Sequence, residues 1–238
     1  MPIFCGADSA DVEGNPELFR LDRSGQPQVL TGCPPDPFAV DGQLWGHPHY
    51  RWSAHRKDHF SWWTERVKVT LDRFDLVRID HFIGFVRAYE VPGNAKNARN
   101  GKWGRTPGRE LLTQVAKKVG QLPFIAEDLG DVTPAVHRLR DEFELPGMRI
   151  LQWAFFDAEG GSNDLPHHHP KHCVVYPGTH DNDTIQGWYQ GLDRSTKKNL
   201  ERYVGEGSQL SPSDMLIQAA LHSPANTAVI QMQDFLGH

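Results

Sequence analysis

The sequence predicts an α/β fold built on parallel strands, and three observations carry this prediction. Short β-branched apolar runs alternate along the chain with helical patterns, six times in all. Nearly every run ends on a polar or acidic residue, as a buried strand does when its carboxyl end opens into a site. No Gly-rich phosphate-binding loop follows any of the runs. A doubly wound sheet and a (β/α)₈ barrel both fit this alternation, and the repeated acids favour the barrel.

The first part of the chain is expected to hold a strand, a long loop and a helix. Residues 3–7 are apolar and end at Asp8, which predicts a buried strand. Residues 14–52 are rich in Gly and Pro, so we expect a long lid-like loop there. Its aromatic residues are candidates to stack on a ligand: Phe38, Trp45, Tyr50 and Trp52. Apolar residues recur at helical spacing over residues 58–74, which predicts a helix.

The run LVRIDHFIGF at residues 76–85 is the centre of the predicted site. Residues 76–79 have the pattern of a buried strand that ends at Asp80. Side chains alternate along a strand, so Arg78 and Asp80 point the same way. A fixed cation beside the carboxylate favours its ionised form, which suits a nucleophile better than a proton donor.

The remaining elements continue the alternation of strand and helix. A polar loop is expected at residues 92–108, helices at 110–119, 133–143 and 211–221, and strands at 122–126, 150–156, 174–176 and 228–232. Thr133 and Pro134 are suited to begin the second helix, and Ser211 and Asp214 to begin the third. Glu127 closes the strand at 122–126.

Three acids, Asp80, Glu127 and Asp181, follow predicted strands. If they meet at one barrel mouth, like-charge repulsion raises the pKa of one carboxyl and leaves another low. One carboxyl then donates a proton while another attacks, as glycoside chemistry with retained configuration requires. Two alternatives stay open at this point. The acids can cap helices or pair with arginine on the surface, or they can bind Mg²⁺ or Zn²⁺.

The other candidate ligands are histidines and tryptophans. His167, His168 and His169 are consecutive and lie between prolines, so they cannot all face one ion, and we predict no metal site. Four tryptophans stand in or beside predicted loops and are candidates to stack on sugar rings: Trp45, Trp52, Trp103 and Trp188. Three stand in helix or strand patterns and are assigned to the core: Trp62, Trp63 and Trp153.

Composition excludes several classes of protein. The chain has 238 residues, of which 38% are hydrophobic and 23% charged, as in an ordinary globular domain. Its 30 acids against 25 bases give a net charge of −5, which argues against nucleic acid and anionic membranes as partners. No apolar run approaches the roughly 20 residues of a membrane span, and no signal peptide is recognised, so a cytoplasmic location is expected. The three separated cysteines, Cys5, Cys33 and Cys173, are interpreted as small apolar residues of the core. Oligomeric state is not predicted.

At these residues the chain resembles the 4-α-glucanotransferases, the amylomaltase or disproportionating-enzyme family of (β/α)₈ barrels. The resemblance covers nearly the whole chain and rests on seven stretches in family order: PIFCGADSADV, GCPPDPFAVDGQLWGHPHYRW, VRIDHFIGF, IAEDLGDVTPAV, LPGMRILQWAF, VVYPGTHDNDT and VIQMQDFLG. Several are long and unusual in composition. They are therefore more specific than three carboxylates alone.

The resemblance implies a role for each matching residue. Asp80 in RIDHF resembles the family's nucleophile, and Glu127 in AEDLG resembles its general acid/base. Asp181 in THDND resembles the third acid, which holds sugar hydroxyls and stabilises the transition state, with His180 beside it. Arg78 matches the motif's cation. Three more residues resemble donor-site and lid contacts: Asp8, Asp36 and Trp45.

The implied activity is transfer of 1,4-α-glucan segments to the 4-hydroxyl of an acceptor sugar by a retaining double displacement. The implied substrates are maltooligosaccharides or other α-1,4-glucans, with no cofactor. The loop at 14–52 is expected to exclude water so that transfer outcompetes hydrolysis. An amylase-type hydrolase and an inactive α-glucan-binding fragment are the alternatives.

Family members also carry a long region before the strand at residues 3–7. We therefore expect a partial barrel with about six of the eight βα units, forming a single catalytic domain over residues 1–238. An unclosed barrel exposes a strand edge and apolar interior, so these residues alone are expected to be inactive or poorly folded. A plastid location is expected instead of a cytoplasmic one if a transit peptide was lost with that region.

Overall fold

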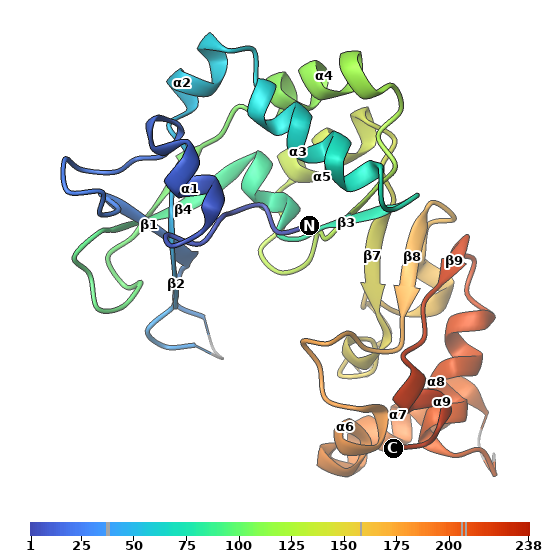
Figure 1. Cartoon of the computed structure of the whole chain (residues 1–238). Helices are drawn as coiled ribbons and strands as arrows, with labels where there is room; N and C mark the ends of the chain where they lie inside the picture. Colours follow the sequence, from blue (N-terminus) through green and yellow to red (C-terminus); the bar gives the residue numbers. More distant parts are fainter. Residues whose placement is uncertain (37–38, 158, 206, 208) are drawn as a thin grey trace. The chain divides into compact units, whose positions relative to one another are not determined.

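The computed structural model describes residues 1–36, 39–157, 159–205, 207 and 209–238. Pro37 and Phe38 of the predicted lid-like loop, including the candidate ring of Phe38, lie outside the described residues. Two compact units divide the chain, unit 1 at Met1–Leu145 and unit 2 at Pro146–His238. Each unit mixes helices and strands, and each is described by itself (Figure 1).

Unit 1 is built around two short parallel strands, β3 (Val77–Ile79) and β6 (Phe124–Ala126). Both were predicted, because each is a short apolar run that ends at an acid. The expected strand over residues 3–7 is reduced to an isolated parallel bridge between Pro2 and Asp80. Residues 3–5 are buried but do not extend this pairing, since the chain turns before helix α1.

Helices pack beside these strands, and α3 and α4 lie next to each other (Figure 1). The unit 1 helices are α1 (Ala10–Gly14), α2 (Trp52–Lys57), α3 (Ser61–Leu71), α4 (Gly108–Val119) and α5 (Pro134–Glu142). The single helix expected over residues 58–74 is wrong at its start. His59 and Phe60 have φ of 54° and 57°, and this left-handed backbone separates α2 from α3. Pro134 begins α5 as expected, but the Thr133 side chain makes no capping hydrogen bond.

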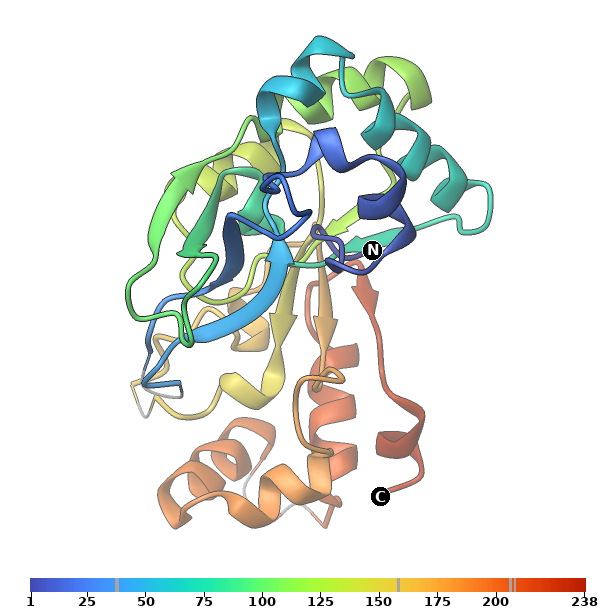
Figure 2. The ribbon, with the colours of Figure 1, turned by 60° about the vertical axis from the view of Figure 1, so that its left-hand side comes forward.

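The segment expected to be a long loop contains two strands of an antiparallel sheet. The sheet has the order β2-β1-β4-β5, seen side by side in Figure 2. Its strands are β1 (Val29–Cys33), β2 (Gln43–Pro48), β4 (Arg87–Pro92) and β5 (Lys102–Arg105). A Cβ atom at Gly32 would clash with the Gln43 carbonyl oxygen, so glycine permits a close approach of β1 and β2. Glycine therefore marks strand packing here and not a loop. The polar loop expected at residues 92–108 likewise contains a strand, β5.

Unit 2 contains three parallel strands with helices beyond their carboxyl ends (Figure 1). The strands are β7 (Gly147–Ile150), β8 (Cys173–Tyr176) and β9 (Thr227–Ala228), and the helices are α6 (Ile185–Gly191), α7 (Arg194–Val204), α8 (Pro212–Leu221) and α9 (Met232–Phe235). The expected strand at 150–156 is wrong, because β7 ends at Ile150 and a 3₁₀ helix follows (Leu151–Trp153). Trp153 is accordingly 41% exposed and does not belong to the core. Within the described ranges, no helix is long and apolar enough to cross a bilayer.

Candidate active site

Strands β3 and β6 place Asp80 and Glu127 at the same edge of unit 1. Ile79 pairs with Ala126 in the parallel register, so the two acids follow directly from adjacent strand ends. The Glu127 N–H donates to the Ile79 carbonyl oxygen at 3.0 Å, which continues the ladder past the last paired residues. The two acids therefore lie at neighbouring positions where both chains leave the sheet.

The Glu127 carboxyl is held by two backbone donors. Its Oε2 accepts the His81 N–H at 2.6 Å, and its Oε1 accepts the Leu129 N–H at 3.1 Å. Burial raises the pKa of Glu127 to about 7, and the Asp80 charge acts in the same direction. The two N–H groups and the Arg78 charge oppose this rise in pKa because they favour the carboxylate. A carboxyl with this pKa can both donate and accept a proton near neutral pH.

Asp80 is held in a different way, by a cation from its own strand. Arg78 Nη1 donates to Asp80 Oδ1 at 2.6 Å, and the Asp80 side chain is 48% exposed. The alternation of side chains along β3 thus brings the two charges together. The structure presents Asp80 with one oxygen oriented by arginine and about half of its side chain open to solvent.

The ring of His81, the residue after Asp80, packs against the ring of Trp45. His81 follows Asp80 with a φ of 54°, and burial lowers the pKa of its imidazole to about 4, so the ring is neutral at pH 7. Trp45 of β2 meets the His81 ring edge-on, with ring centroids 4.9 Å apart. The predicted lid residue Trp45 therefore contacts the residue that follows Asp80.

Asp36 and Asp8 are the other two residues of unit 1 that were predicted to contact a ligand, and they differ in how they are connected to Asp80 and Glu127. Asp36 lies beyond β1, is exposed, and accepts the Ala39 N–H on its Oδ1 at 2.6 Å. Burial raises the pKa of the Cys33 thiol to about 11, and the charges of Asp36 and Glu127 add to this. Cys33 therefore lies close enough to Asp36 and Glu127 for both charges to act on its thiol. Asp8 is exposed in the turn before α1 and is not brought to the Asp80–Glu127 pair by any described contact.

In unit 2, His180 and Asp181 stand on a turn after β8. His180 Nε2 lies 3.4 Å from Asp181 Oδ1, and the two side chains are 73% and 68% exposed. Asn182 holds the turn, because its Oδ1 accepts both the N–H and the hydroxyl of Thr179 at 2.9 Å. The turn is fixed through its backbone, while the side chains of His180 and Asp181 remain open.

The sequence of the chain matches a family profile described as 4-alpha-glucanotransferase over residues 1–238. The chain belongs to the 4-alpha-glucanotransferase family. The 4-alpha-glucanotransferase of Solanum tuberosum, named chloroplastic/amyloplastic, is 47% identical over 238 residues, which are 100% of this chain and 41% of that protein. The Thermus thermophilus 4-alpha-glucanotransferase is 44% identical, with coverages of 99% and 48%.

A solved amylomaltase from Streptococcus agalactiae, in complex with acarbose, superposes with a TM-score of 0.97 at 38% identity. The match covers 100% of this chain and 48% of the Streptococcus agalactiae amylomaltase. The amylomaltase of Corynebacterium glutamicum has a TM-score of 0.73 at 16% identity and shows a shared fold. This member of the family therefore spans less than half the length of the relatives it matches.

Sequence reasoning missed residues that support the turn after β8. Gln152 is buried and donates from Nε2 to the Asp183 carbonyl oxygen at 2.9 Å. Gln231 donates from Nε2 to the Gly178 carbonyl oxygen at 3.3 Å. A Cβ atom at Gly178 would lie 2.8 Å from Gln152 Nε2, so the glycine makes room for this amide. The only sequence signal was a glutamine within or just after an apolar run.

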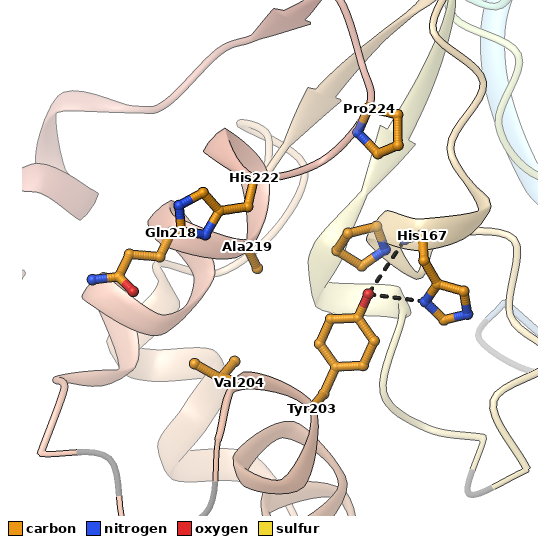
Figure 3. A pocket seen from close by; sticks show the side chains of 8 residues that line it. His167, Tyr203, Val204, Gln218, Ala219, His222 and Pro224 are labelled. Carbon is orange, nitrogen blue, oxygen red and sulfur yellow. Dashed lines mark hydrogen bonds between the residues drawn. The ribbon is translucent and has the colours of Figure 1, made fainter.

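One cavity of about 430 Å³ lies within unit 2 and is separate from the predicted residues (Figure 3). Its lining comes from the ends of α7 and α8 and from the 3₁₀ helix Pro166–His168, and includes Tyr203, which is hydrogen-bonded to His167 Nδ1 at 2.9 Å. None of the predicted site residues lines it. Among the described residues, no group of three or more His, Cys, Asp or Glu side chains is arranged to hold a metal ion.

Proposed function

We propose that this chain carries the catalytic carboxylates of a 4-α-glucanotransferase. The observation that supports this most is the pair at the ends of β3 and β6. Glu127 has a pKa of about 7 and is held by two N–H donors, while Asp80 beside it is oriented by Arg78 at 2.6 Å. Such a pair divides the work between a proton donor and a nucleophile, and both acids stand in the motifs of the family.

In the proposed reaction, protonated Glu127 donates to the glycosidic oxygen while Asp80 attacks the anomeric carbon. The bond to the leaving sugar breaks, and a covalent glucosyl ester forms on Asp80. Glu127, now a carboxylate, then accepts the proton of an acceptor 4-hydroxyl, whose oxygen attacks the same carbon and releases Asp80. Two inversions retain the α-configuration.

The remaining predicted residues have supporting roles in this proposal. Asp181 holds sugar hydroxyls with His180 beside it, and their exposure in unit 2 is compatible with a ligand contact. Trp45 contacts the donor sugar or closes over it, as do Asp36 and Asp8. We also propose that the parallel strands and the bridge at Pro2 are six strands of a (β/α)₈ barrel in one catalytic domain. The close structural match to an amylomaltase supports this.

The proposed substrates are maltooligosaccharides or other α-1,4-glucans, and the proposed location is the cytoplasm or a plastid. The names of the relatives support α-glucans as the substrate class. Relatives named chloroplastic/amyloplastic support a plastid as one of the two proposed locations. The segment at 14–52 is proposed to exclude water, now as a sheet edge with connecting turns and not as a plain loop.

Incubation of the purified protein with maltotriose tests this proposal. A transferase yields glucose and longer maltooligosaccharides at a constant number of reducing ends, whereas an increase in reducing ends indicates a hydrolase. Formation of the transfer products by residues 1–238 alone would overturn the expectation that these residues are inactive by themselves. Asp80→Asn should lower the rate by about 10⁴-fold or more, because the nucleophile is lost. The matched change Asp75→Asn, at an exposed residue before β3, should have no effect. Binding of maltodextrin by residues 1–238 without any product would support the glucan-binding alternative for these residues.

A further inference from the structure

His81 has a backbone conformation that residues other than glycine seldom adopt. Its φ of 54° and ψ of 55° lie in the left-handed region, where an L-residue with a Cβ atom is crowded against its own backbone. Such residues persist when the surrounding structure holds them, and they are concentrated at functional sites. The residue follows the proposed nucleophile directly, so its backbone also determines how the chain leaves β3.

At this left-handed turn the His81 N–H faces the other predicted acid, Glu127. This N–H donates to Glu127 Oε2 at 2.6 Å, which is shorter than the bond that Oε1 of the same carboxyl accepts from the Leu129 N–H at 3.1 Å. The next residue, Phe82, donates its N–H to the Glu127 carbonyl oxygen at 3.0 Å. Two consecutive N–H groups thus fasten the end of β3 to a single residue at the end of β6.

The imidazole has no equivalent polar role in the structure. Its Nε2 is buried and has no hydrogen-bond partner among the described residues. The ring packs edge-on against Trp45 and lies close to Gly84, where a Cβ atom would come within 3.2 Å of His81 Cδ2. The specific contact with the carboxyl of Glu127 is therefore made by the backbone of His81.

We propose that His81 is a positioning residue: its left-handed backbone lets its own N–H hold the Glu127 carboxylate while the next N–H, of Phe82, holds the Glu127 carbonyl oxygen, and the two bonds together fix the orientation of the acid/base side chain. The inference rests on the proposed function for the role of Glu127, but its geometry does not depend on that role. A hydrogen bond to the charged form of a carboxyl lowers its pKa. The His81 N–H therefore keeps the pKa of the buried Glu127 carboxyl close to neutral pH, because it opposes the rise in pKa that burial causes.

Other charged and titratable groups act on the same carboxyl and must stay in place. Arg78 and Asp80 act from β3 and its end, and the thiol of Cys33 interacts with Glu127 from β1. The comparison must therefore change the backbone preference of residue 81 and leave these groups untouched. Replacing His81 by two residues that both lack the imidazole, one tolerant of positive φ and one not, meets this requirement.

The test is the pKa of Glu127 in His81→Gly and His81→Val, measured by carboxyl ¹³C NMR titration of the full chain with Glu127→Gln for assignment. Glycine adopts positive φ freely, whereas a β-branched residue strongly resists it. We expect His81→Gly to keep the wild-type pKa and His81→Val to raise it by on the order of one unit, the value of a charge-assisted hydrogen bond. His81→Ala carries the same comparison, with a smaller shift, if His81→Val does not fold.

Two results would overturn the proposal. An equal pKa change in the glycine and valine variants would assign the effect to the lost imidazole. An unchanged pKa in both, even with lower thermal stability, would reduce His81 to a structural residue. The titration needs no substrate, so a failure of glucan transfer leaves this test intact, and a failure of this test leaves the transfer assay intact.

Discussion

The acids at the strand ends of the two units have opposite surroundings. Glu127 in unit 1 is fastened by two backbone N–H groups and has a pKa raised to about 7, whereas the Asp181 side chain in unit 2 is 68% exposed beside His180. Both follow a short parallel strand in the sequence. The same pattern therefore produces one carboxyl suited to proton transfer and one suited to contact a polar ligand. The difference comes from what packs around each strand end.

The largest expected effect comes from comparing Glu127→Gln with Asp181→Asn on two glycosyl donors, maltotriose and α-maltotriosyl fluoride. Loss of a general acid should slow transfer from maltotriose by about 10² to 10⁴-fold. With α-maltotriosyl fluoride, whose fluoride leaves without protonation, the first turnover of Glu127→Gln should be restored toward the wild-type rate. Asp181→Asn should be impaired on both donors, because Asp181 is proposed to contact the sugar and not the leaving group. Rapid-quench measurement of fluoride and glucose checks this.

Equal losses of Glu127→Gln on both donors would remove the distinction between the two acids. The same would follow if the fluoride rescued Asp181→Asn as strongly as Glu127→Gln. Either result would show that the buried surroundings of Glu127 do not serve proton donation.

The pH dependence of stability is a second and smaller way to separate the two surroundings. The pKa of Glu127 rises from 4.5 to about 7 on folding, so between these values the folded chain binds a proton that the unfolded chain has released. Stability from this group is complete below about pH 4.5 and is lost as pH rises through 7. We expect Glu127→Gln, relative to wild type, to be more stable at pH 8 than at pH 5 by about 1 to 3 kcal/mol.

Urea unfolding of both proteins at the two pH values measures this difference. The pKa of His81 is lowered to about 4, so that residue has the opposite pH dependence, but it is present in both proteins and cancels. Asp181→Asn, at a side chain that is 68% exposed, serves as the matched change in unit 2, and we expect its effect on stability to be the same at the two pH values. A flat difference for Glu127→Gln would contradict the buried surroundings.

The sequence predicted strand ends well and their surroundings poorly. Strands β3 and β6 and the neighbouring positions of Asp80 and Glu127 follow from apolar runs that stop at an acid, and this is local information. The left-handed His81 and its bond to Glu127 depend on a partner 46 positions away, which no local pattern reports. The loop predicted for residues 14–52 was wrong where β1 and β2 form, because Gly32 permits a close contact between these strands and does not mark a loop.

Unit 2 was harder to predict because its apolar runs do not coincide with its strands and helices. An apolar run at residues 150–156 spans a strand end, a 3₁₀ helix and the exposed Trp153, so hydrophobicity alone could not separate them. Helices α6 and α7 were not predicted, and α7 is strongly polar along its length. Of its residues only Thr196 and Leu200 are buried, so few apolar side chains mark this helix in the sequence.

The smallest predicted effect concerns the turn that carries Asp181. Asn182→Ala removes the acceptor for the N–H and hydroxyl of Thr179, which is buried, and should lower the free energy of unfolding by about 1 to 2 kcal/mol. If unit 2 positions Asp181 through this backbone, the variant should raise KM for maltotriose more than it lowers kcat. Asn199→Ala is the matched control, since it loses a hydrogen bond to the Phe155 carbonyl oxygen in the same unit and away from the turn. A loss of stability in both variants with an unchanged KM in Asn182→Ala would mean that the turn, unlike the backbone donors at Glu127, does not position its acid.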